Sequence, residues 1–410
     1  MAFLFYLVYM SSYFLHFGAR VPVLGSIRID LILVVLTAAC IILLREDNGQ
    51  TRLDKSGIVL LGLLLYIIMS LPFVQWPGSV IRFGLENYFK VIIFYFFTVL
   101  TVTNQRKLKI LLLVFVACQT YRVLEPMYLH WTTGYWGDTT YMGDGEMMNR
   151  LAGSPYDVIN PNGLAYVAVT ALVYLYYLSP ILPGALKVAG YAVLPIMVYA
   201  LVLTGSRSGM LAIAGVAMAI IMTSRKKAIL LGVAAVVAVL AFQSLGQMQQ
   251  ERYLSIYRDD VRGASTAQGR IEGLITDFEV AMNNPLFGHG LGTSLEANYN
   301  IGRSVFRSHN LVMEVWQEIG FIGLFIFFLF IFTCIRNMLF ALRKTKLADG
   351  NALFSIAKGV RAWLVLNLIF CVFSYGLSSY SWYLFGGLSV VLLRLSACHE
   401  ARKENGAVPA

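Results

Sequence analysis

The chain has 410 residues, of which 58% are hydrophobic and 13% charged, and its formal net charge is +10. Soluble domains carry roughly 25% charged residues, so this composition excludes an ordinary water-soluble fold. A bilayer tolerates it because apolar side chains there face lipid. The excess positive charge lies in short loops between apolar segments, which is typical of a membrane protein and gives no nucleic-acid-binding signal.

Twelve apolar segments of membrane-spanning length follow one another along the chain. They predict an all-α protein that forms a single polytopic membrane domain, residues 1–410, with about twelve transmembrane helices. The first segment has no basic leader and no small-residue cleavage site, so we expect a retained helix. The segments are 2–17, 28–45, 57–75, 87–104, 108–126, 162–178, 185–204, 208–223, 228–245, 311–335, 359–376 and 380–397.

The distribution of lysine predicts which loops face the cytoplasm. With both termini inside, nearly every lysine falls in an inside loop, as the positive-inside rule requires, and Lys90 is the exception. Two long segments, 127–161 and 246–310, then face outward. Loops of this length are uncommon unless they bind a ligand or take part in catalysis. In the second segment we expect short helices, for instance around 269–283.

Cysteine and histidine patterns give no sign of a metal or a disulfide framework. All five cysteines lie in or at the ends of apolar segments, where they act as small packing residues. No two histidines have the spacing of metal ligands. We therefore predict no catalytic metal held by histidine and no cofactor.

The second outer segment contains six arginines and no lysine. A guanidinium group binds phosphate through two parallel hydrogen bonds, which the point charge of lysine cannot do. The alternative is that the arginines pair with nearby acidic residues on a solvated face, and we favour it for Arg252, Arg258 and Arg262. The arginines are Arg252, Arg258, Arg262, Arg270, Arg303 and Arg307.

Arg207 is an arginine with apolar residues on both sides, in LTGSRSGML at the outer end of segment 208–223. A cation at membrane depth is costly and by default marks a substrate path. The alternative is that its side chain extends to lipid headgroups. The two interpretations overlap, because lipid phosphates are the simplest ligand for this side chain.

His309 precedes the tenth apolar segment, in RSHNLVMEVWQEIGFIGLF. Ser308 is a plausible N-cap, which places the imidazole in the first helical turn. The partial positive charge of a helix N-terminus favours a neutral imidazole, which can act as a general base. The alternative is a hydrogen-bonded interfacial histidine without chemistry. Glu314 and Glu318 follow, and they either orient His309, bind substrate or pack.

Four segments together resemble the bacterial O-antigen ligase and polymerase family of membrane glycosyltransferases. They lie in the order typical of that family, and the resemblance covers about residues 150–330, with the remainder matching by topology only. The segments are INPNGLA (159–165), the R-x-x-x-L of Arg207 to Leu211, GRIEGLITDFEVAMNNPLFGHGLG (269–292), and the H-x10-G of His309 to Gly320.

The resemblance implies a multi-helix glycosyltransferase of the C type in the bacterial inner membrane. The donor would be a glycan on undecaprenyl diphosphate at the outer face of that membrane, and neither a metal nor a nucleotide would be required. By motif, Arg207 and Arg270 would bind the diphosphate, and His309 would deprotonate the acceptor hydroxyl for attack with inversion. Arg303 and Arg307 rank below them as diphosphate ligands.

Several alternatives remain for the acceptor substrate and for the class of reaction. The arginine and histidine motifs favour a ligase that uses a lipid A–core sugar over a polymerase that joins lipid-linked repeat units, and an exopolysaccharide system is a further option. A protein-glycosylating enzyme gains no support, because there is no large soluble domain. A lipid-linked glycan transporter is disfavoured, because we find no internal repeat and the charges lie at outer helix ends.

Overall fold

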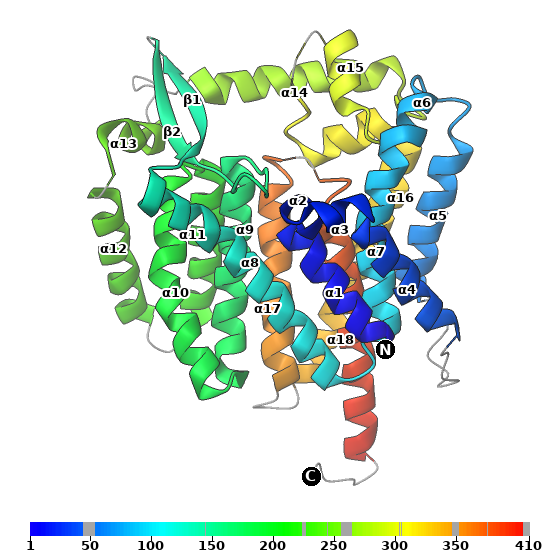
Figure 1. The fold of residues 1–410 in the computed structure, drawn as a ribbon, viewed down its shortest axis with the longest axis horizontal. Helices are drawn as coiled ribbons and strands as arrows, with labels where there is room; N and C mark the ends of the chain where they lie inside the picture. The colour runs from blue at the N-terminus through cyan, green and yellow to red at the C-terminus, as the bar shows by residue number, and fades with distance from the viewer. Residues whose placement is uncertain are drawn as a thin grey trace. The chain divides into compact units, whose positions relative to one another are not determined.

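A computed structural model describes residues 1–43, 54–143, 145–223, 227–243, 245–255, 265–302, 304, 306–346, 352–374 and 376–404. The chain is mostly helical, and each of the predicted apolar segments coincides with one helix (Figure 1). The helices are α1 (Ala2–Leu15), α2 (Phe17–Arg20), α3 (Pro22–Ser26), α4 (Ile29–Leu43), α5 (Lys55–Met69), α6 (Pro77–Ser79), the π-helix η1 (Val80–Gly84), α7 (Leu85–Thr101), α8 (Gln105–Thr133), α9 (Pro161–Leu178), the 3₁₀ helix η2 (Ser179–Ile181), α10 (Gly184–Leu203), α11 (Arg207–Thr223), α12 (Lys227–Gln243), α13 (Gln247–Leu254), α14 (Ser265–Asn283), α15 (Ser294–Asn300), α16 (Leu311–Lys346), α17 (Ala352–Phe370) and α18 (Tyr380–Glu404).

Length and hydropathy divide the apolar helices into two groups. Within the described residues, seven helical segments are long and apolar enough to cross a membrane, and five apolar helices are shorter, at 10–17 residues. The chain is therefore a multi-pass membrane protein, while the number of twelve spans and the orientation of the termini stay predictions. The expected helix around 269–283 is confirmed as α14.

The first outer segment departs from the all-α expectation. It contains an antiparallel hairpin of β1 (Gly137–Gly143) and β2 (Glu146–Leu151), in which Gly137 pairs with Leu151. Side chains alternate along β2, with Met148 and Arg150 buried and Met147 exposed, which is the pattern of a strand with one covered face. The preceding helix α8 also continues to Thr133, past the predicted end at 126.

The chain divides into two compact units, and their positions relative to one another are not determined. The first unit consists of Met1–Tyr6, Val35–Ile110 and Arg270–Ala410, and the second of Leu7–Val34 and Leu111–Gly269. Each unit is described by itself below.

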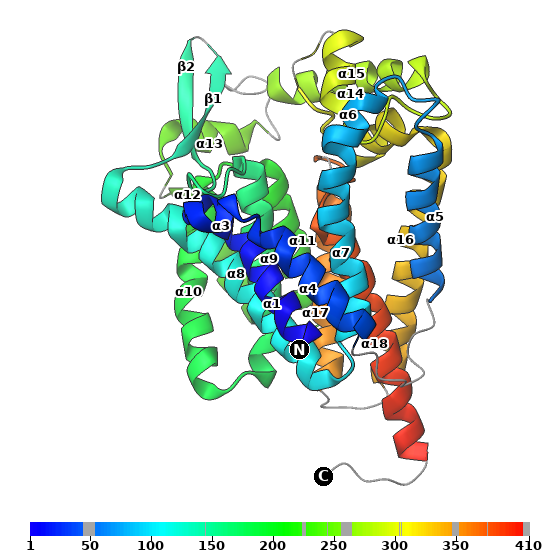
Figure 2. The same cartoon turned by 45° about the vertical axis from the view of Figure 1, so that its right-hand side comes forward.

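In the first unit, α18 packs against α7 and α16 through glycines and aromatic rings. A Cβ on Gly386 would stand 2.9 Å from the Phe330 ring and 3.0 Å from the Tyr95 ring, so only glycine permits this approach. The rings of Phe330 and Tyr383 stack with centroids 5.9 Å apart. In the same unit, α14 and α15 lie at the end of α7 that carries α6 (Figures 1 and 2).

In the second unit, α9 forms the centre and packs against α10 and α11. A Cβ on Gly209 of α11 would stand 2.7 Å from the Cβ of Ala165 in α9, so small residues set the distance between these two helices. Asn160 caps α9 by accepting the N–H of Gly163 at 2.8 Å, and Pro161 occupies the first helical position. INPNGLA therefore opens a span, as predicted.

Candidate functional site

Arg207 is the first residue of α11 in the second unit, and its side chain is only 8% exposed. The helix starts here because the hydroxyl of Ser206 accepts the N–H of Gly209 at 3.2 Å, which is an N-cap interaction. Gly205 enters the turn with φ 57°, a conformation that favours glycine. The Arg207 guanidinium donates to the hydroxyl of Ser255 at 3.1 Å.

Two further buried arginines converge on the turn that leads into α11. Nε of Arg150 donates to the carbonyl of Thr204 at 2.7 Å, and Nε of Arg252 donates to the carbonyl of Gly205 at 2.8 Å. Both side chains are buried. Two buried guanidinium groups therefore bond the turn directly before Arg207. Together with Arg207 they form an arginine cluster, and fixed cations of this kind suit an anionic ligand such as a diphosphate.

Arg150 also brings two of the four motif segments together. Its terminal nitrogens donate to Thr140 Oγ1 at 3.2 Å and to Asn162 Oδ1 at 3.1 Å. One guanidinium therefore links β1, the INPNGLA segment and the turn before Arg207. The sequence places these elements far apart, and the structure gathers them around one side chain.

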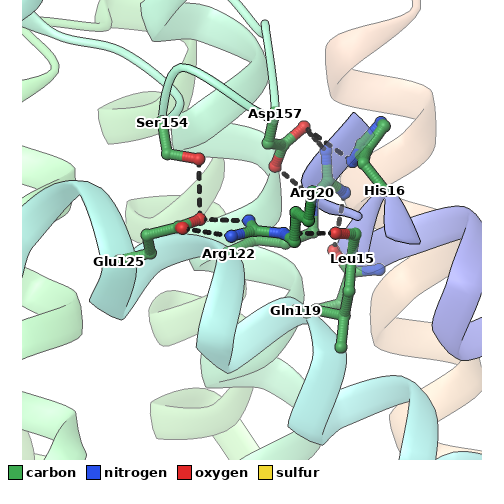
Figure 3. A network of polar contacts seen from close by, with 8 residues as sticks. All are labelled: Leu15, His16, Arg20, Gln119, Arg122, Glu125, Ser154 and Asp157. Carbon is green, nitrogen blue, oxygen red and sulfur yellow. Dashed lines mark hydrogen bonds and ion pairs between the residues drawn. The ribbon is translucent and has the colours of Figure 1, made fainter. Parts of the chain in front are cut away.

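A second polar network fixes the segment that leads into α9 (Figure 3). Arg122 of α8 donates to both oxygens of Asp157, at 2.6 and 3.0 Å, and both side chains are buried. Arg20 of α2 donates to both oxygens of Glu125, which also accepts the hydroxyl of Ser154 at 2.6 Å. Bidentate pairs of this kind hold a loop in a defined position, so the start of α9 is tied to both α8 and α2.

The contacts in this network determine which of its side chains carry charge. The hydrogen bonds from Arg20 to Glu125 raise the pKa of the Arg20 guanidinium, which therefore stays charged. His16 lies with Nδ1 3.9 Å from an oxygen of Asp157. The network accordingly pairs its carboxylates with arginine rather than with histidine.

His309 lies in the first unit, on an exposed segment two residues before α16. The predicted cap was wrong: Asn310 caps the helix by accepting the N–H groups of Val312 at 2.9 Å and Met313 at 3.2 Å. Ser308 instead accepts the N–H of Asn310 at 3.3 Å. The imidazole is thus outside the first helical turn, and the helix dipole acts on it less than expected.

The segment before His309 is held by a buried group of three polar side chains. Asn298 of α15 donates to the carbonyl of Phe306 at 3.1 Å and to Asp277 of α14 at 2.9 Å. Gln317 of α16 donates to Asp277 Oδ1 at 3.1 Å and to Asn298 Oδ1 at 2.9 Å. Three helices thereby position the segment while the His309 side chain itself stays exposed.

Glu314 and Glu318 have structural partners in the first unit. Glu314 accepts the backbone N–H groups of Gly376 at 2.5 Å and Leu377 at 2.9 Å. Glu318 accepts those of Gly292 at 2.7 Å and Ser294 at 3.4 Å. Both carboxylates are buried, and each connects α16 to a loop. These contacts give them a structural role, and an effect on His309 stays a prediction.

The helix α16 is interrupted at Gly320, whose backbone is non-helical with φ 67°. The loop after α14 pairs with the interrupted backbone. The N–H of His289 donates to Gln317 O at 2.7 Å, that of Gly290 to Glu318 O at 2.9 Å, and that of Phe321 to Pro285 O at 2.8 Å. These bonds satisfy groups that a helix break would otherwise leave unpaired, so the third and fourth motif segments form one structural unit.

His289 is a buried structural histidine in this loop. Its Nε2 lies 2.8 Å from the carbonyl of Val280 and its Nδ1 2.7 Å from the side-chain amide of Gln75. Its ring lies 5.4 Å from that of Trp76. Burial lowers the pKa of the His289 imidazole. These contacts give His289 a structural role in the loop.

The predicted site residues are distributed over both units. Arg207 lies in the second unit, whereas Arg307 and His309 lie two residues apart in the first, both with exposed side chains. Arg303 and the side chain of Arg270 fall outside the described residues, as do Arg258 and Arg262.

The sequence analysis did not predict two arginines of the cluster as site residues. The interpretation of Arg252 as part of a solvated face was wrong, because its side chain is buried and donates to the carbonyl of Gly205, and the polar segment QMQQERYL gives no signal of this. Arg150 was overlooked, although the alternation in β2 places it on the same face as Met148.

Residues 192–328 match a family model described as O-antigen ligase. The O-antigen ligase family is therefore the known family that this segment resembles. The O-antigen ligase match contains Arg207, the loop that pairs with α16, and His309. Residues 6–147 match a family of unknown function, DUF5935, and no curated protein matches the chain.

Proposed function

We propose that this O-antigen ligase-family protein is a metal-independent glycosyltransferase. It moves a glycan from undecaprenyl diphosphate to a sugar hydroxyl of lipid A–core at the outer face of the inner membrane. The observation that supports this most is that two buried arginines, Arg150 and Arg252, bond the turn that leads into Arg207. A diphosphate gains charge as it leaves, and fixed guanidinium groups stabilise that charge.

In the proposed reaction, His309 accepts the proton of the acceptor hydroxyl, whose oxygen attacks the anomeric carbon with inversion. The bond from that carbon to the diphosphate oxygen breaks, and its electron pair stays with the diphosphate. Arg207 and Arg270 bind the diphosphate, with Arg303 and Arg307 as further ligands. The exposure of His309 supports this role, since a bulky acceptor can reach it.

The proposal is tested with purified protein, a synthetic undecaprenyl-diphosphate glycan and lipid A–core acceptor. We expect a glycosylated acceptor together with free undecaprenyl diphosphate. A donor that grows longer on its own lipid, with the acceptor unchanged, would instead identify a polymerase. Movement of intact donor across liposomes without release of undecaprenyl diphosphate would identify a transporter and overturn the enzymatic proposal.

A further inference from the structure

The helix α14 carries an exposed apolar stripe on a segment that is otherwise polar. Five exposed side chains recur at helical spacing along one face, over about 17 Å of helix at 1.5 Å per residue. They are Ile271, Leu274, Ile275, Phe278 and Met282, which are 39–56% exposed.

The other two faces of α14 have different surroundings. Asp277, Val280 and Ala281 are buried and face the protein, where Asp277 accepts hydrogen bonds from Asn298 and Gln317. Glu272 and Glu279 are exposed on the opposite edge. The stripe therefore lies between a protein-facing side and an acidic side, which is how an interfacial helix is organised.

Aromatic rings connect this stripe to α16. The ring of Phe278 lies 5.5 Å from that of Trp316, which lies 6.2 Å from that of Phe321. Phe321 begins the long apolar part of α16, where Phe325 and Phe332 are exposed at 61–66% along one face, as in a helix that faces lipid. The apolar surface thus continues from the membrane-spanning helix onto α14, which runs across α16 (Figures 1 and 2).

We propose that α14 is an in-plane membrane helix whose stripe is inserted among the lipids at the bilayer surface. Continuity with the lipid-facing side of α16 identifies lipid as the occupant, because a second protein copy would have to displace lipid from both helices. The acidic edge with Glu272 and Glu279 then faces water. This inference does not depend on the proposed reaction.

The consequence is a fixed height for the segment that carries His309. Asp277 of α14 binds Asn298, which in turn binds the carbonyl of Phe306. An embedded α14 therefore holds this segment close to the membrane surface, within reach of a lipid headgroup.

The test places a fluorescent label at single cysteines of the full-length protein in lipid vesicles. The parent variant carries Cys40→Ser, Cys371→Ser and Cys398→Ser and retains buried Cys118 and Cys334. Labels at Ile275→Cys and Phe278→Cys probe the stripe. A label at Glu279→Cys is the matched control on the same helix, and the unlabelled parent gives the background.

We expect lipids with a spin label near the headgroup to quench the labels at 275 and 278, and aqueous iodide to leave them unquenched. The label at 279 should be quenched by iodide and not by the spin-labelled lipids. The proposal is overturned if iodide quenches the label at 275 as strongly as that at 279. It is equally overturned if neither quencher reaches 275 and 278 while 279 responds normally, since a protein surface would then cover the stripe.

Discussion

Gly320 lies so close to Leu286 that a Cβ atom on Gly320 would stand 2.1 Å from the carbonyl oxygen of Leu286. The glycine combines this approach with φ 67°, which L side chains adopt only under strain. The break in α16 therefore requires glycine for two independent reasons.

We expect Gly320→Ala to destabilise the protein severely. The left-handed backbone alone costs about 1–3 kcal/mol, and the overlap with Leu286 adds to it. Thermal unfolding in detergent measures the change. Gly62→Ala in α5 is the matched control, since a Cβ there has no neighbour within 4 Å. Equal melting temperatures for both variants would show that the loop adapts to the added methyl group.

Arg207→Lys should retain the fold and lose transfer by about 10²-fold or more, because a point charge cannot replace a planar pair of donors at a developing anion. The initial rate of glycan transfer per folded protein measures this. Arg82→Lys, at an exposed arginine of η1, is the control and should leave the rate unchanged. Full activity of Arg207→Lys would mean that this guanidinium supplies only charge or packing.

The substitution Arg252→Met removes the hydrogen-bond donor to the Gly205 carbonyl and retains an apolar side chain of similar length. A buried carbonyl left without its partner costs about 1–3 kcal/mol, so we expect a lower melting temperature. Arg82→Met removes an exposed arginine and serves as the control. If Arg252→Met has the same melting temperature as the wild type, the 2.8 Å hydrogen bond from Arg252 to the Gly205 carbonyl makes no measurable contribution to stability.

The sequence predicted the helices well and the local contacts poorly, for different physical reasons. Hydropathy locates a span without knowledge of its partners, and a short helix around 269–283 was expected in the second outer segment. Ser308 and Asn310 are both good caps, and the choice depends on the N–H of Leu311, which donates to Cys371 O at 2.9 Å. No local pattern contains that distant partner.

Two other features of the candidate site could not be predicted from the sequence, because they also depend on distant hydrogen-bond partners. The break at Gly320 could not be predicted from its neighbours in the sequence, which continue the apolar segment. The hydrogen bonds that stabilise the break are made with the distant loop at 285–290. Arg252 lies among polar neighbours, and its partner Gly205 is 47 residues away. Burial that arises from distant partners leaves no periodic trace in the sequence.

His309→Ala should lower transfer by about 10²–10⁴-fold, the usual contribution of a positioned base, and leave the melting temperature unchanged because the side chain is exposed. Transfer rate and thermal unfolding are measured on the same preparation. Asn300→Ala, at an exposed residue of α15, is the control. Near-normal transfer by His309→Ala would remove the histidine from the mechanism.

His289 should make stability depend on pH. Burial lowers its pKa in the folded protein, whereas the unfolded chain has the ordinary value of about 6.5. As pH falls below about 6.5, the unfolded state takes up a proton that the folded state does not, so stability falls and then levels off below the folded pKa.

The measurement compares melting temperatures at pH 7.5 and pH 5.5, with about 1.4 kcal/mol lost for each unit by which the pKa is lowered. His289→Gln should show a smaller decrease between the two pH values. An identical decrease in both proteins would assign the pH dependence to other groups.

The pair between Arg20 and Glu125 also bears on how the protein is made. The two residues are separated by 105 positions, so at 5–20 residues per second roughly 5–20 s pass before the ribosome delivers the partner of Arg20. During that interval Arg20 lacks its carboxylate partner and has only nearby groups such as the carbonyl of Leu15 as acceptors. The early part of the chain is therefore committed to its place only after several later helices have been synthesised.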